Sequence, residues 1–106
     1  MIVPCSGNTL AKIASGIADN LVTRVAAVCL KERRKLVLVP RETPLSPIAL
    51  ENMTQLARLG VVVLPAMPGF YGRAETVQDL VDFVAGRILD TLGVPNELAA
   101  RWRGKD

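Results

Sequence analysis

Two unbroken aliphatic runs constrain the fold of this chain more than any other feature. Leu36–Val39 and Val61–Leu64 lack the apolar–polar alternation of a half-buried strand, and each is followed by a proline. Such runs are typical of strands buried on both faces of a parallel sheet. A β-branched pair, Ile2–Val3, precedes Pro4 at the start of the chain. We therefore expect a sheet of about three parallel strands.

Helical patterns occupy the segments between and after these runs. Apolar side chains recur every three or four residues over about 9–31, 47–59 and 77–92. Ser46 and Thr76 are predicted N-caps of the second and third helices. The order β-α-β-α-β-α predicts an α/β fold with three long helices covering both faces of a parallel sheet. Three strands are few for this class, so we expect these residues to be part of a larger domain.

Composition and charge exclude several classes of partner. The chain has 106 residues and half of them are apolar, which excludes a disordered segment. The net charge of +3 is too small to indicate nucleic acid or an anionic membrane surface. No apolar stretch reaches the length of roughly 18 residues that a membrane span needs. Neither nucleic acid nor a membrane is therefore expected as a partner.

The sequence contains no histidine and two cysteines, which limits its chemistry. Ser-His-Asp triads and Cys-His pairs are excluded, so proton transfer falls to a carboxylate, lysine, tyrosine or thiol. Cys5 and Cys29 are too few to enclose a metal ion, and no metal is expected. We interpret them as buried thiols in a reducing compartment, which predicts a cytoplasmic protein.

Three segments that follow the expected strands carry most of the polar side chains that chemistry would need. They are 5–9, 41–46 and 65–73. The carboxyl ends of parallel strands meet at one edge of the sheet, and ligands of open α/β sheets bind beyond that edge. We therefore expect the functional site there.

The first of these segments, Ser6 to Thr9, stands at a predicted helix N-terminus. Its backbone N–H groups and two hydroxyls could receive a phosphate or a ring carbonyl. An ordinary capped turn, with Asn8 or Thr9 as N-cap, explains the same residues.

The adjacent charges of Arg41 and Glu42 directly follow a buried strand. Arg41 could hold an anion in bidentate fashion, and Glu42, partly shielded from water, could move a proton. A local ion pair between the two is the alternative.

Several further residues have both a functional and a structural interpretation. Tyr71, on a glycine-bracketed loop, could approach a ligand or pack over the sheet edge. Arg87 has apolar neighbours in sequence, so we expect it to be buried with an anion or with Asp82 or Asp90. The cations from Lys31 to Lys35 are interpreted as a solvated helix end from which Lys31 alone could turn inward.

Short motifs distributed over essentially the whole chain resemble those of one known family. Arg-Glu-Thr-Pro-Leu at 41–45 and Pro-Gly-Phe-Tyr at 68–71 are specific in combination. With Pro4–Leu10, Leu30–Arg34 and Arg101-Trp102, they resemble the C-terminal half of the flavin prenyltransferases, formerly called aromatic acid decarboxylases.

The resemblance implies a Rossmann-like or flavodoxin-like three-layer αβα fold. Residues 1–106 would be the C-terminal part of a single flavoprotein domain, without its N-terminal flavin-phosphate-binding part. It also implies binding of reduced FMN and dimethylallyl phosphate, and transfer of the dimethylallyl group to N5 and C6 of the flavin. The prenylated FMN would go to a partner aromatic acid decarboxylase, as in ubiquinone biosynthesis. The assembly would be a homo-oligomer, typically a dodecamer.

Matching positions assign roles to individual residues. The flavin contacts implied by the resemblance are Ser6, Gly7, Asn8, Thr9 and Arg41. Glu42 takes the acid–base role. The resemblance places five residues at or near the prenyl phosphate: Lys31, Tyr71, Arg87, Arg24 and Trp102.

Two other hypotheses stay open at this point. A truncated homologue could act as a non-catalytic flavin-binding or oligomerisation module of the same fold. A related flavin-dependent cysteine decarboxylase is weaker, because the resemblance to those enzymes would require a histidine that this sequence lacks.

Overall fold

A computed structural model of the chain describes residues 1–70, 72 and 74–98. By their internal contacts they divide into two compact units, Met1–Pro65 and Ala66–Asp106, and each is described by itself. The first unit contains β1 (Ile2–Cys5), α1 (Gly7–Ala14), α2 (Leu21–Lys31), β2 (Val37–Pro40), α3 (Pro47–Arg58) and β3 (Val62–Val63). The second contains α4 (Val77–Leu92).

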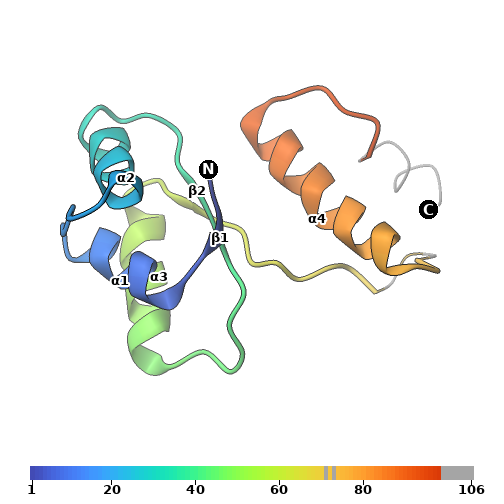
Figure 1. Ribbon diagram of the computed structural model, residues 1–106, viewed down its shortest axis with the longest axis horizontal. Helices are drawn as coiled ribbons and strands as arrows, with labels where there is room; N and C mark the ends of the chain where they lie inside the picture. Colours follow the sequence, from blue (N-terminus) through green and yellow to red (C-terminus); the bar gives the residue numbers. More distant parts are fainter. Residues whose placement is uncertain (71, 73, 99–106) are drawn as a thin grey trace. The chain divides into compact units, whose positions relative to one another are not determined.

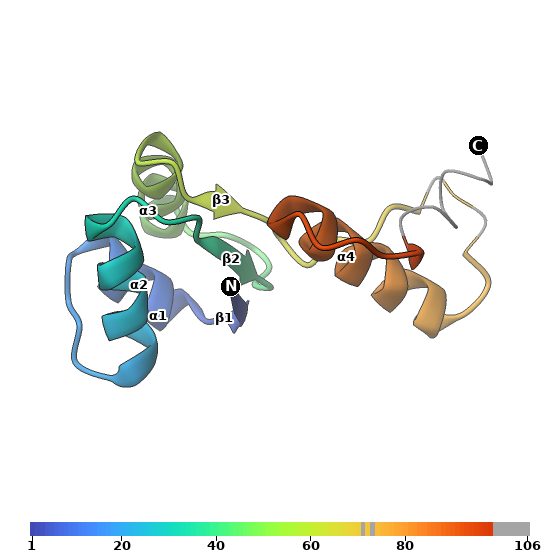
Figure 2. The same ribbon diagram turned by 90° about the horizontal axis from the view of Figure 1, so that it is seen from above.

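The strands of the first unit form one parallel sheet in the order β1-β2-β3. Ile2 pairs with Leu38, and Leu38 in turn pairs with Val63. Both crossovers step in the same direction, so right-handed connections place their helices on one face. Figure 2 shows α1, α2 and α3 on the same side of these strands. The predicted α/β class with a parallel sheet is confirmed.

The helix predicted over 9–31 is two helices, so the described residues contain four helices instead of three. α1 ends at the C-cap Ser15, and Gly16 follows at φ 76°, in the left-handed region that glycine adopts without strain. Asn20 then starts α2 by accepting a hydrogen bond from Thr23 N, in a capping box. Figure 1 shows α1 and α2 as separate helices. The apolar spacing continues across the turn between them, and that continuity concealed the break.

The strands also differ in part from the expected ones. β1 continues through Pro4 to Cys5, and β2 includes Pro40. Every residue of β2 is buried, as predicted for a strand covered on both faces. Val62 and Val63 are only half-buried, so the prediction of a second fully buried strand was wrong for β3. Its position at the end of the strand order explains this, because an edge strand has one neighbour fewer.

The core of the first unit lies between the sheet and its helices. Leu38 of β2 belongs to it, as does Leu36 directly before the strand, in keeping with the two-residue period of extended chain. The buried residues that form this cluster are Cys5, Leu10, Ile13, Ala26, Leu36, Leu38, Leu56 and Val61.

The second unit is described chiefly by α4. Thr76 caps it, as predicted, by accepting a hydrogen bond from Asp79 N, and Gly93 ends it at φ 74°. Val77 and Val81, which belong to its apolar stripe, are exposed. No helix among the described residues is long and apolar enough to cross a membrane.

Candidate functional site at the carboxyl edge of the sheet

The carboxyl ends of β1 and β2 bring two of the predicted segments together. The turn after β1 starts α1 at Gly7, and the loop after β2 contains Arg41 and Glu42. Gly7 N donates a hydrogen bond of 2.8 Å to Glu42 Oε1, across 35 residues of sequence. The expected meeting of these segments is therefore confirmed. The third segment, 65–73, runs from the last residue of the first unit into the second unit.

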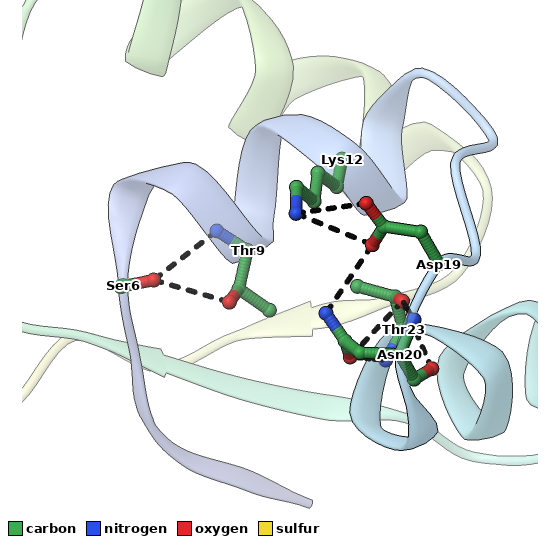
Figure 3. A network of polar contacts seen from close by, with 6 residues as sticks. All are labelled: Ser6, Thr9, Lys12, Asp19, Asn20 and Thr23. Atoms are coloured by element: carbon green, nitrogen blue, oxygen red, sulfur yellow. Dashed lines mark hydrogen bonds and ion pairs between the residues drawn. The ribbon is translucent and has the colours of Figure 1, made fainter.

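The N-terminus of α1 is capped by Ser6 and not by Asn8 or Thr9. Ser6 Oγ accepts a hydrogen bond of 3.1 Å from Thr9 N and donates one of 3.1 Å to Thr9 Oγ1 (Figure 3). The Gly7 N–H is already bonded to Glu42. The anion that this helix terminus holds is thus a carboxylate of the chain itself, which the positive end of the helix dipole stabilises.

Glu42 and Arg41 do not form the local ion pair considered above. Within the described part of the chain, neither side chain has an ion-pair partner. Both are exposed, so the expected shielding of Glu42 from water is absent in this structure. Glu42 Oε2 has no hydrogen-bond partner among the described residues.

An open groove of about 670 Å³ runs beside these residues. Ser6, Thr9 and Arg41 supply polar groups to its lining, whereas Leu21 and Val22 give it an apolar wall. Gly7 and Asn8 do not line it. An apolar wall with a few polar side chains is typical of small-molecule sites.

A polar network, which sequence reasoning missed, lies beside the apolar wall of the groove. Lys12 pairs with Asp19 at 3.1 Å, and Asn20 Nδ2 donates to Asp19 Oδ1 at 3.3 Å (Figure 3). Asn20 caps α2 and lines the groove next to Leu21. The spacing Asn-x-x-Thr from Asn20 to Thr23 is the signal that identifies this helix start.

Cys5 is fully buried at the end of β1, directly before the turn. Burial, and secondly the nearby Glu42 carboxylate, raise the pKa of its thiol. A thiol that is hard to ionise is a poor nucleophile, which confirms the interpretation of Cys5 as a packing residue. Cys29 is half-buried, and both cysteines are free.

Arg24 and Lys31 are not part of the groove lining. Arg24 and Lys31 are exposed on α2, so Lys31 does not turn inward. Tyr71 and Trp102 lie outside the described residues.

Arg87 is exposed on α4, and the expectation of a buried arginine was wrong. Asp82 accepts a hydrogen bond from Gln78, and Asp90 accepts one from Asn96. Sequence neighbours do not share a helix face, so Arg87 lies beside the apolar stripe and not within it.

A second hollow of about 280 Å³ lies at the amino edge of the sheet. Arg33, Arg34 and Lys35 line it, where α2 and α3 end. Both helices direct their C-terminal carbonyls toward this region, and cations there offset the negative end of the helix dipole. This arrangement explains the basic run without a ligand.

Comparisons with known proteins find relatives of this chain among flavoproteins. The chain is 57% identical over 106 residues to a flavin prenyltransferase UbiX of Methanothermobacter thermautotrophicus, covering 100% of this chain and 56% of that protein. It is 58% identical over 102 residues to the flavin prenyltransferase UbiX of Pseudomonas aeruginosa, covering 96% and 49%. The chain thus spans about half the length of the curated relatives that it matches.

The chain is also similar to solved structures of flavoproteins. A dodecameric FMN-dependent UbiX-like decarboxylase of Escherichia coli O157:H7 matches with a TM-score of 0.85 and 58% identity, over 88% of this chain and 50% of that one. AnUbiX (PadA1), in complex with FMN and dimethylallyl pyrophosphate, matches with a TM-score of 0.84 and 53% identity, over 87% and 49%. The family described as Flavoprotein matches residues 1–89. This chain therefore belongs to the flavoprotein family.

Proposed function

We propose that this chain provides part of the active site of a flavin prenyltransferase. The enzyme would transfer the dimethylallyl group of dimethylallyl phosphate to N5 and C6 of reduced FMN. The observation that carries the proposal is the groove lined by Ser6, Thr9 and Arg41, with the Glu42 carboxylate beside it. Relatives at 57–60% identity that are named flavin prenyltransferases support it.

The lining of the groove offers contacts that suit a flavin ring. Leu21 and Val22 offer an apolar surface for the ring, and the Ser6 and Thr9 hydroxyls can hydrogen-bond to its polar edge. Arg41 can donate to an oxygen of the ring or to a phosphate. Bound here, FMN supplies the two ring positions that are prenylated.

Glu42 is the residue that we assign to proton transfer. Closing a new ring at C6 of the flavin breaks the double bond of the dimethylallyl group, adds one proton to the middle carbon of that group, and removes one proton from C6. Gly7 N–H occupies Oε1 and leaves Oε2 to accept the proton. Because the chain has no histidine, we assign this work to the carboxylate that follows Arg41 of the groove lining.

We propose that lysine, arginine and tyrosine side chains of this chain bind the prenyl phosphate. Breaking the bond between the dimethylallyl carbon and the phosphate oxygen leaves a phosphate anion, which Lys and Arg side chains stabilise. The residues proposed for this role are Arg24, Lys31, Tyr71, Arg87 and Trp102. Arg24, Lys31 and Arg87 are exposed and hence available to a ligand or a second subunit.

The proposal includes a homo-oligomer, a partner aromatic acid decarboxylase that receives the prenylated FMN, and a cytoplasmic location. Leu21, Val25 and Val28 form an exposed apolar stripe on α2, which favours burial against another chain or segment. The two free cysteines are consistent with a reducing compartment. We also propose that residues 1–106 are part of one flavoprotein domain.

Turnover in a chimera tests the proposal. This chain would replace the matching region of the Methanothermobacter thermautotrophicus enzyme, with which it aligns over its whole length. We expect the chimera to convert FMN, a reductant and dimethylallyl phosphate into prenylated FMN, detected by mass spectrometry. A folded chimera that binds FMN but forms no prenylated product would contradict the proposal and favour the non-catalytic flavin-binding module.

A further inference from the structure

The Glu42 carboxylate lies closer to Gly7 than the capping of α1 requires. The hydrogen bond from Gly7 N places Glu42 Oε1 directly over the first residue of α1. A Cβ atom added to Gly7 would lie 2.6 Å from Glu42 Oε1, 2.9 Å from Oε2 and 3.1 Å from Cδ. Any side chain at position 7 therefore excludes the carboxylate from its present position.

The absence of a side chain at position 7 is not needed for the backbone. Gly16, Gly60 and Gly93 adopt positive φ angles, but Gly7 does not, and its conformation is open to alanine. The atoms that a Cβ would meet are the far end of the flexible Glu42 side chain. A side chain here would hence move the carboxylate and leave the fold in place.

We propose that Gly7 is a positioning residue for Glu42: its missing side chain admits the carboxylate and its N–H fixes which oxygen remains free. This inference rests on the proposed function, because it gives the orientation of the group to which we assign proton transfer. Fixing one oxygen limits the directions from which the other can meet a proton. Displacement of a reacting group by about 1 Å can lower a rate on the order of 100-fold.

Kinetics of Gly7→Ala in the chimera test the proposal. We expect kcat to fall between about 10- and 100-fold while KM for FMN changes less than about twofold, because the groove lining is untouched. The pH profile of kcat should shift on the limb that Glu42 controls. In the double variant Gly7→Ala/Glu42→Gln, kcat should equal that of Glu42→Gln alone, because Gly7 acts only through Glu42.

Gly16→Ala is the matched control. It makes the same chemical change at the other end of α1, where nothing lies within 4 Å of the added Cβ. The positive φ of Gly16 means that this control lowers stability. We expect a lower Tm with an unchanged pH profile. A Gly7→Ala variant with wild-type kcat, or a loss that adds fully to that of Glu42→Gln, would overturn the proposal.

A measurement without flavin separates this inference from the proposed function. In ¹⁵N-labelled chain, the Gly7 amide proton should shift as Glu42 ionises, and Glu42→Gln should abolish that shift. If the amide responds but the chimera makes no prenylated FMN, the pairing stands and the prenyltransferase proposal fails. A Gly7 amide whose shift does not depend on Glu42 overturns the pairing, whatever the activity.

Discussion

The two edges of the sheet in the first unit are both hollowed and both charged, yet they differ in the direction of the helices that end there. At the carboxyl edge α1 begins, and its N-terminus holds the Glu42 carboxylate. At the amino edge α2 and α3 end, beside Arg33, Arg34 and Lys35. Cations at helix C-termini and anions at helix N-termini are each the favourable choice.

The difference lies in what each edge leaves available to a ligand. The cations at the amino edge are accounted for by the two helix ends. At the carboxyl edge, Arg41 has no ion-pair partner within the described residues, although Glu42 is next to it in sequence. The carboxyl edge therefore differs from the amino edge in the direction of its helices, and not in the number of its charges.

The largest effect is expected from Glu42→Gln, which keeps the size of the side chain and removes its charge. In the chimera, prenylated-FMN formation should fall at least about 100-fold, the lower range for loss of an acid–base group. The affinity for FMN should change less than about twofold, because Glu42 does not line the groove. Retention of most of the turnover would remove Glu42 from the mechanism.

A matched pair of arginine variants compares the two edges directly. Arg41→Ala should weaken FMN binding about 10- to 100-fold, the cost of losing a hydrogen bond to a charged group. Arg34→Ala removes the same charge from the amino edge and should leave the dissociation constant unchanged. Fluorescence titration with FMN measures both. Equal losses would mean that net charge, and not the groove, governs binding.

The pH dependence of stability probes the buried thiol at the carboxyl edge. Because burial raises the pKa of Cys5 in the folded state, the unfolded chain loses that proton first as the pH rises. The free energy of unfolding should hence fall above about pH 8.5, by up to about 1.4 kcal/mol per pH unit. Urea unfolding of Cys5→Ala should lack this slope. A wild-type chain with the same slope as the variant would contradict the raised pKa.

The smallest effect is expected from Ser6→Ala, which removes the N-cap of α1. The free energy of unfolding should fall by about 1 kcal/mol, measured by urea unfolding of the chain. Ser46→Ala removes the equivalent cap of α3 and serves as the reference. If Ser6→Ala also weakens FMN binding and Ser46→Ala does not, the Ser6 hydroxyl contacts the ligand as well as the helix.

The sequence allowed the parallel strands and their carboxyl edge to be predicted because local patterns determine both. The buried run Leu36–Val39, and the caps Ser46 and Thr76, were correct for this reason. The break at Gly16 was missed because the apolar spacing of α1 continues in register with that of α2. A single glycine inside a helical pattern is weak evidence for a turn.

The candidate site was predictable in its location but not in its contacts. Strand polarity alone places Ser6 and Arg41 at one edge. Pairing Gly7 with Glu42 depends on the order of the strands, which no local pattern specifies. The exposure of Arg87 depends on the helical phase, and neighbouring residues in sequence are a poor guide to it.

The central claim is that the carboxyl-edge groove receives the flavin, and a crystal structure of the chimera with FMN tests it most directly. We expect the ring to lie against Leu21 and Val22, with Arg41 and the Ser6 or Thr9 hydroxyl within hydrogen-bond distance of its polar edge. Flavin bound at the amino edge, or bound elsewhere without contact to Ser6, Thr9 or Arg41, would contradict the account.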